Sequence, residues 1–239
     1  LYRSFPKNNA WHVVANKVDV SGPVRNAKIR LRYDPIKNDE IISVFLTERS
    51  DTDSYRKITD VTDKVFNGML YLDIPNGNHS VIYIVKTLAY AERGYYIDML
   101  DKDSVRVLID TVYEPHYKRF KSYFGNTFVG FFSDEPRFAN GRYGNVYAGH
   151  DYETSVGKFG VAHPWKDSLK DELKFSEEDL LALWFDIGDN TSDIRIKYMK
   201  KITDLYAENF TVQLSEWCHE RGVVYTGHII EDMNSHTKT

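Results

Sequence analysis

Residues Thr127 to Pro136 read TFVGFFSDEP, a short apolar run that ends in two adjacent carboxylates and a proline. An uninterrupted apolar run of this length is typical of a strand that is buried on both faces of a parallel sheet. Asp134 and Glu135 are therefore expected at the C-terminal end of a strand, which is the edge where α/β proteins bind their ligands. For either acid alone, a helix N-cap or a loop salt bridge is the alternative explanation.

Upstream of this strand, the sequence alternates between strand and helix patterns. Residues 94–100, GYYIDML, predict a short strand that contains Asp98 near its end. Apolar side chains then recur on one helix face, at Val105, Leu108, Ile109, Val112 and Tyr113. Pro115 interrupts this helix pattern, and Gly125 is expected to end the element. A strand, a helix and a strand in this order predict parallel pairing.

Downstream, about thirty residues from 137 to 165 are rich in Gly, Tyr and His, and they predict a long loop over the end of the strand. A helix is expected to begin at Ser176. A long amphipathic helix is then predicted over residues 192–221, closed by Gly222. The next apolar strand, VVYTGHII at 223–230, is followed by Glu231 and Asp232. Acids therefore follow three predicted strands, which predicts a rim of carboxylates.

The first third of the chain has a different pattern. Residues 41–48, IISVFLTE, predict a strand, and Ser21 to Pro23 predict a turn. Residues 69–74 and 79–88 are rich in β-branched and aromatic residues, and the intervening Pro75 to Asn78, PNGN, predicts a hairpin turn between them. We therefore expect residues 1–90 to be mainly antiparallel β structure, as a sandwich-like insertion, and residues 91–239 to form about three βα units.

Composition excludes several classes of protein. With 239 residues, 42% of them hydrophobic and 28% charged, the sequence is that of a globular chain. Its net charge of −4 and lack of a basic block argue against nucleic-acid binding. No apolar run approaches the roughly 18 residues that span a membrane, and no signal peptide opens the chain, which favours the cytoplasm. The single cysteine, Cys218, excludes an intramolecular disulfide and a cysteine-based zinc cluster.

Carboxylates gathered on one rim suit two kinds of chemistry. In glycoside hydrolysis, one acid protonates the leaving oxygen while another attacks the sugar or activates water. Alternatively, several carboxylates bind Mg²⁺ or Ca²⁺. His150, His163 and His228 also leave a transition-metal hydrolase open, although no HExxH motif is present. The aromatic content of 14% suits a cleft in which flat rings cover sugar faces.

Residues 92–125, 127–136 and 206–228 resemble large bacterial glycoside hydrolases, including the α-L-rhamnosidase-like and β-galactosidase-like groups. The resemblance implies a partial (β/α)8 TIM barrel interrupted by a β-sandwich insertion, with Glu135 as the acid/base at the end of the fourth strand. Many relatives carry Asn where this chain has Asp134. They take their nucleophile from a seventh strand that this chain does not reach, so we expect a piece of a longer protein that is inactive by itself.

These observations predict a glycoside hydrolase that acts on oligo- or polysaccharides. Glu135 is its general acid, with a pKa raised by burial or by Asp134, and Glu231 is the second catalytic acid. The residues expected to bind the substrate are Asp98, Asp134, Tyr143, Tyr147, Trp165, His228 and Asp232. No cofactor is expected, although the carboxylates could hold a structural Ca²⁺. A non-catalytic carbohydrate-binding module and a metal-dependent hydrolase are the alternative functions.

Overall fold

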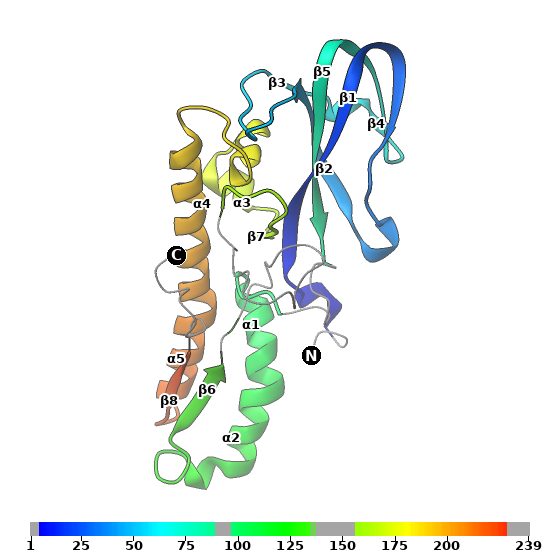
Figure 1. Cartoon of the computed structure of the whole chain (residues 1–239). Coiled ribbons are helices and arrows are strands. Elements are labelled where there is room, and N and C mark those ends of the chain that lie inside the picture. Colours follow the sequence, from blue (N-terminus) through cyan, green and yellow to red (C-terminus); the bar gives the residue numbers. More distant parts are fainter. Residues whose placement is uncertain (1–4, 89–96, 135, 137–155, 229–239) are drawn as a thin grey trace. The chain divides into compact units, whose positions relative to one another are not determined.

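The computed structural model describes residues 5–88, 97–134, 136 and 156–228. The chain divides into two compact units, which we describe one at a time (Figure 1). The sheet unit consists of Trp11–Glu92 and Asn140–Met199. The helix–strand unit consists of Leu1–Ala10, Arg93–Ala139 and Lys200–Thr239. Among the described residues, no helix combines the length and the apolar character that crossing a membrane requires.

The sheet unit is built on one six-stranded sheet in which every strand pair is antiparallel. Its strands follow the order β3-β2-β5-β1-β7, and β4 pairs with β5 outside this path. Two of the strands are unusually long and curved in Figure 1: β1 has 20 residues and β5 has 19. The strand bounds are β1 Trp11–Arg30, β2 Glu40–Glu48, β3 Ile58–Asp60, β4 Val65–Phe66, β5 Met69–Thr87 and β7 His163–Trp165.

The predicted hairpin at Pro75 to Asn78 is wrong, because β5 continues through these residues. The predicted turn at Ser21 to Pro23 is wrong for the same reason, since β1 pairs with β5 on both sides of it and Gly22 lies opposite Gly77. A Cβ atom on Gly22 would lie 1.8 Å from the carbonyl oxygen of Pro75. Gly22 therefore allows two curved strands to approach each other closely, and it does not mark a reversal of the chain.

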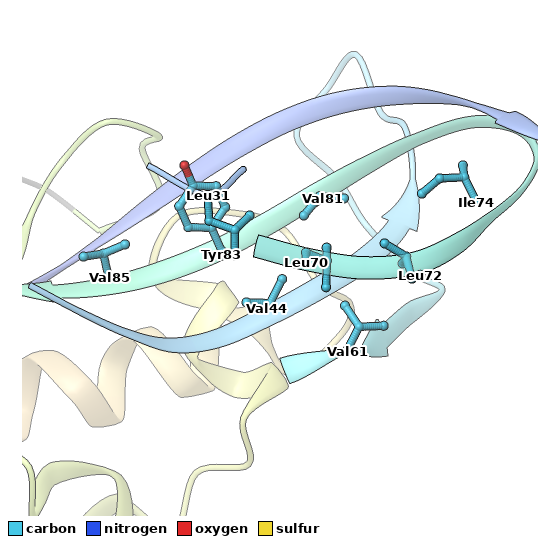
Figure 2. Close-up of a cluster of buried hydrophobic side chains, with 9 residues drawn as sticks. All are labelled: Leu31, Val44, Val61, Leu70, Leu72, Ile74, Val81, Tyr83 and Val85. Atoms are coloured by element: carbon cyan, nitrogen blue, oxygen red, sulfur yellow. The ribbon is translucent and has the colours of Figure 1, made fainter. Parts of the chain in front are cut away.

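One hydrophobic core cluster of the sheet unit lies among β1, β2 and β5, as Figure 2 shows. Every residue of β5 from 79 to 87 is buried, because β1 and β2 flank this half of the strand on either side. This explains why its sequence reads as an almost continuous apolar run. The nine buried side chains of this cluster are Leu31, Val44, Val61, Leu70, Leu72, Ile74, Val81, Tyr83 and Val85.

Short helices complete the sheet unit. The predicted start at Ser176 is confirmed: Asp179 Oδ2 accepts from the Ser176 backbone N–H, and Ser176 Oγ accepts from that of Asp179. The helix that follows is a 3-10 helix, η6, at Glu178–Leu183. The remaining short helices of this unit are η2 Pro35–Lys37, η3 Thr62–Lys64 and α3 Leu169–Leu173. The first residues of α4, Thr191–Tyr206, also belong to it.

The helix–strand unit contains two helix, turn and strand segments (Figure 1). Each helix contains a π-helical turn, and in the first this turn comes just before Pro115, which lacks the N–H that a regular α-helical bond needs. Gly125 and Gly222 adopt positive φ after the helices, as predicted. The first segment is α1 Lys102–Leu108, η4 Ile109–Tyr113, α2 Glu114–Phe120, η5 Lys121–Tyr123 and β6 Gly130–Asp134. The second is α4, η7 Ala207–Val212, α5 Gln213–His219 and β8 Val224–His228; η1 Pro6–Asn8 also lies in this unit.

The predicted (β/α)8 barrel is wrong. Most of the strand structure is the curled antiparallel sheet, and β6 with β8 is the only parallel strand pair among the described residues. Nor is β6 buried on both faces as predicted, since Phe132 is exposed, as is Val129 just before the strand. The strand and helix patterns depend on residues that are close in the sequence. The closure of a barrel depends instead on which strands far apart in the sequence pair with each other, and these patterns do not contain that information. Of the strand expected at 94–100, residues 94–96 lie outside the described residues, and over 97–100 the prediction is wrong, because only Ile97 forms a β-bridge, with Asn9.

Candidate functional site

The C-terminal ends of β6 and β8 form the candidate functional site. The two strands pair in parallel, and their register places Asp134 directly beside His228. Two glycines allow this close pairing: a Cβ atom on Gly130 would lie 2.2 Å from the Val224 carbonyl oxygen, and one on Gly227 would lie 2.0 Å from that of Ser133. The sequence therefore brings an acid and an imidazole together at one edge.

Asp134 and His228 face each other across this edge. His228 Nδ1 lies 3.4 Å from Asp134 Oδ1, and the Phe132 ring meets the imidazole edge to face, with centroids 5.2 Å apart. Both polar side chains are open to solvent, at 77% for Asp134 and 54% for His228. With Nδ1 turned toward the carboxylate, Nε2 is directed away from it. The pair can therefore offer both an acceptor and a ring nitrogen to a bound molecule.

The opposite face of these strands is fixed against the helices. Phe131 of β6 stacks on Tyr113, with ring centroids 4.0 Å apart, and meets Trp217 edge to face. Glu114 Oε1 accepts hydrogen bonds from Trp217 Nε1 and from Arg221 Nη2, each at 2.8 Å. Burial raises the pKa of the Tyr113 hydroxyl far above its usual range, so this phenol stays neutral. The strands that carry the site are thus packed against aromatic side chains of the helices.

Asp98 has a local structural task in the same unit. Its Oδ1 accepts from the Leu100 backbone N–H at 2.9 Å, and its own N–H donates to the Asn8 carbonyl at 2.8 Å. Asn209 Nδ2 donates to the Leu100 carbonyl at 2.8 Å. These bonds fasten the chain just before α1. Their pattern explains the burial of Asp98, and its predicted contact with substrate stays a prediction.

Two of the other predicted residues lie in the sheet unit. Trp165 is only 4% exposed and pairs with Trp11 of β1. His163 is buried next to Trp184, and its Nε2 donates to the Leu183 carbonyl at 3.1 Å. Burial lowers the pKa of His163 to about 3, so its ring is neutral at ordinary pH. Within the described part of the chain, no group of three or more His, Cys, Asp or Glu residues could hold a metal ion.

The other predicted site residues lie outside the described residues. They are the catalytic pair Glu135 and Glu231, together with Tyr143, Tyr147, His150 and Asp232. By sequence, Glu135 is the residue after Asp134, and Glu231 follows His228 by three positions. Their roles stay predictions.

Sequence reasoning missed a second polar site, which lies in the sheet unit. Lys86, Asp167, Lys170 and Glu177 form ion pairs around a small pocket. One signal for it was available: Lys86 interrupts the apolar run VIYIVKTL, and a lysine within a buried strand needs a partner.

Comparisons with known proteins show a distant likeness to a solved structure. No protein-family model matches the chain, and no curated protein matches it. A solved structure that resembles it is the rhamnosidase from Novosphingobium sp. PP1Y, with a TM-score of 0.46 and 18% sequence identity. The match covers 75% of this chain and 17% of the rhamnosidase chain, so this chain spans only a small part of that protein's length. Rhamnosidases are glycoside hydrolases.

Proposed function

We propose that the chain is a glycoside hydrolase whose reaction takes place at the C-terminal ends of β6 and β8. One observation carries this proposal: parallel pairing puts Asp134 beside His228 at one strand edge, and Glu135 is the next residue in the chain. The edge therefore has an acid and an imidazole, and the sequence adds a further carboxylic acid directly after Asp134. Such a set can bind sugar hydroxyls and move a proton.

In the proposed reaction, Glu135 protonates the glycosidic oxygen as the bond to the anomeric carbon breaks. Glu231 either attacks that carbon or activates the water that does so. Glu135 follows β6 and Glu231 follows β8 by three residues, so the two acids come after neighbouring parallel strands in the sequence.

Asp134, His228 and Phe132 are proposed to hold the sugar. An ionised Asp134 accepts hydrogen bonds from two neighbouring hydroxyls, which is a strong interaction because the acceptor is charged. His228 Nε2 exchanges a hydrogen bond with a third hydroxyl. The exposed Phe132 ring, which already contacts His228, offers an apolar surface to the C–H face of the sugar. The high exposure of all three side chains supports a role in binding.

Hydrolysis of a panel of alkyl glycosides and disaccharides, whose leaving groups need a proton, tests the proposal, with wild type compared with Glu135→Gln. We expect the substitution to lower kcat/KM by about 10² to 10⁴-fold, which is the usual contribution of a general acid. Glu48→Gln is the matched control, because Glu48 is an exposed carboxylate of the sheet unit that forms an ion pair with Lys57. Activity of Glu135→Gln within threefold of wild type, at about the control's level, would remove Glu135 from the mechanism. Failure of the wild type to cleave any glycoside would refute the activity.

A further inference from the structure

The sheet unit contains a pocket of about 210 Å³ that the hydrolysis proposed at β6 and β8 does not use. We propose that it binds a neutral polyhydroxy compound of the size of one sugar ring. This inference is independent of the proposed hydrolysis, since it concerns other residues. The pocket is lined by Glu40 and Ile42 of β2, Lys86 of β5, Trp165 of β7, Asp167, Lys170 of α3, and Glu177 and Leu180 at η6.

Lys86 is the innermost charge of the pocket. Only 10% of its side chain is exposed, and its Nζ lies 2.6 Å from Asp167 Oδ1 and 3.8 Å from Glu40 Oε2. The ammonium also lies 4.5 Å from the centroid of the Trp11 ring, which is within cation–π range. A lysine this deeply buried is costly unless it is paired. Its partners therefore fix the position of the ammonium in the pocket wall.

A second ion pair forms another part of the wall. Lys170 Nζ binds Glu177 Oε1, and Ser43 Oγ donates to Glu177 Oε2 at 2.8 Å. The lining thus has two ammonium groups and three carboxylates, with a formal charge of −1. Each lysine already has a carboxylate partner before any ligand arrives, and one carboxylate is in excess.

The existing ion pairs favour a neutral ligand. An anion would have to displace Asp167 or Glu177 from its lysine, and it would face a lining that is already negative. A cation would compete with two lysines for the same carboxylates. Hydroxyl groups have neither problem, because an ammonium has three donors and a carboxylate has about four acceptor positions, more than one ion pair uses.

Size and shape narrow the choice further. The volume of about 210 Å³ is below the roughly 300 to 1,000 Å³ of sites for drug-sized ligands. Ile42, Leu180 and Trp165 add apolar wall to the charged groups. Alternating hydroxyls and C–H groups, as on a pyranose ring, match a lining of this mixed kind. The geometry therefore points to a single monosaccharide ring or a polyol of that size.

A titration followed by NMR tests this inference on the full chain. The ligands are neutral hexoses and a 6-deoxyhexose, with glucuronate and glucosamine as charged analogues of the same shape. The readout is the indole N–H cross-peak of Trp165, assigned by comparison with Trp165→Phe. We expect a neutral sugar to move this peak with a Kd of about 1 mM, and the charged analogues to bind several-fold more weakly.

Asp167→Asn is the diagnostic variant, because Asp167 is mostly exposed and its replacement should leave the fold intact. Without its main partner, Lys86 is repositioned, and we expect affinity to fall about tenfold. Asp204→Asn, which breaks the exposed Lys200–Asp204 pair, is the matched control with unchanged affinity. No movement of the Trp165 peak with any sugar would overturn the inference, as would tighter binding of glucuronate or equal affinity in both variants. A chain that binds sugar here but cleaves no glycoside would refute only the proposed hydrolysis.

Discussion

Replacing Glu114 with alanine should destabilise the helix–strand unit much more than the loss of an ordinary surface ion pair. Glu114 Oε1 accepts one hydrogen bond from the Trp217 indole and one from the Arg221 guanidinium, both at 2.8 Å. Trp217 in turn packs against Phe131 of β6. The carboxylate therefore connects α2 to the end of α5, beneath the strands of the candidate site.

The magnitude follows from the two bonds. A hydrogen bond to a charged group contributes about 1.5 to 3 kcal/mol, so two of them would contribute about 3 to 6 kcal/mol if fully buried. Glu114 and Arg221 are 19% and 18% exposed, and Arg221 keeps its bonds to the Trp217 carbonyl and to Glu220. Water can therefore replace part of the loss. We expect Glu114→Ala to lower the free energy of unfolding by about 2 to 4 kcal/mol.

Urea denaturation followed by tryptophan fluorescence and circular dichroism measures this change. Trp217 is the only tryptophan in the sequence of the helix–strand unit, so its indole N–H peak in an NMR spectrum reports on this unit alone. We expect that peak to lose its protection from hydrogen exchange in Glu114→Ala. Glu114→Gln keeps one acceptor and should cost about half as much.

The control is Asp204→Ala, which removes an exposed pair between residues four apart on a helix and should cost less than about 0.5 kcal/mol. If Glu114→Ala costs no more than this control, the carboxylate does not connect the helices as described. Unchanged protection of the Trp217 indole would lead to the same conclusion.

Three further predictions concern other parts of the molecule. First, the pKa of His163 is lowered to about 3, so its NMR signals should not titrate between pH 8 and pH 4. At pH values between about 6.5, the ordinary pKa of histidine, and about 3, His163 is protonated in the unfolded chain but not in the folded chain. The free energy of unfolding should therefore fall as the pH is lowered through this range. A titration midpoint of His163 near pH 6.5 would contradict this account. Second, Gly130→Ala should lower unfolding free energy by about 2 to 3 kcal/mol in urea denaturation, because the added methyl overlaps the Val224 carbonyl. At Gly188 an added Cβ would meet no other atom, and only the positive φ is unfavourable, so Gly188→Ala should lower the free energy of unfolding by about 1 kcal/mol. Equal losses of stability in the two variants would refute the steric argument. Third, Asp134→Asn should lower kcat/KM for glycosides by about ten- to a hundredfold through the loss of a charge-assisted hydrogen bond, and unchanged kinetics would exclude Asp134 from sugar binding.

Local patterns predicted the helices well. The long helix over 192–221 is present as α4, η7 and α5, because its apolar residues recur at helical spacing and are buried, as Ile202, Leu214 and Trp217 show. Gly222 has the positive φ expected of a residue that ends a helix. Such features depend on residues close together in the chain, which a single sequence contains in full.

Long-range pairing could not be predicted in the same way. The Asn-Gly step at residues 76 and 77 has the residue types of a hairpin turn. Even so, β5 continues through these residues, because β1 pairs with the parts of β5 on both sides of them. The parallel barrel failed for a related reason. The sequence predicted that strands would alternate with helices, but it did not show which strands would become neighbours.

The candidate site was only partly accessible from sequence. Asp134 and His228 were both named, but their direct pairing depends on the register of β6 with β8, which only the structure shows. Lys86 offered the clearest missed signal, since its charge stands in a buried strand. Its partner Asp167 is 81 residues away and has nothing distinctive in its own surroundings to mark it.

The central claim, that Glu135 supplies the proton in glycoside cleavage, is tested most directly with two substrates that differ in leaving group. A nitrophenolate leaves with little help from an acid, whereas a sugar or alkyl alkoxide needs its proton. We predict that Glu135→Gln lowers kcat/KM by about 10² to 10⁴-fold on an alkyl glycoside or disaccharide, and by much less on the nitrophenyl glycoside of the same sugar. Equal losses on both substrates, or no loss on either, would contradict the account.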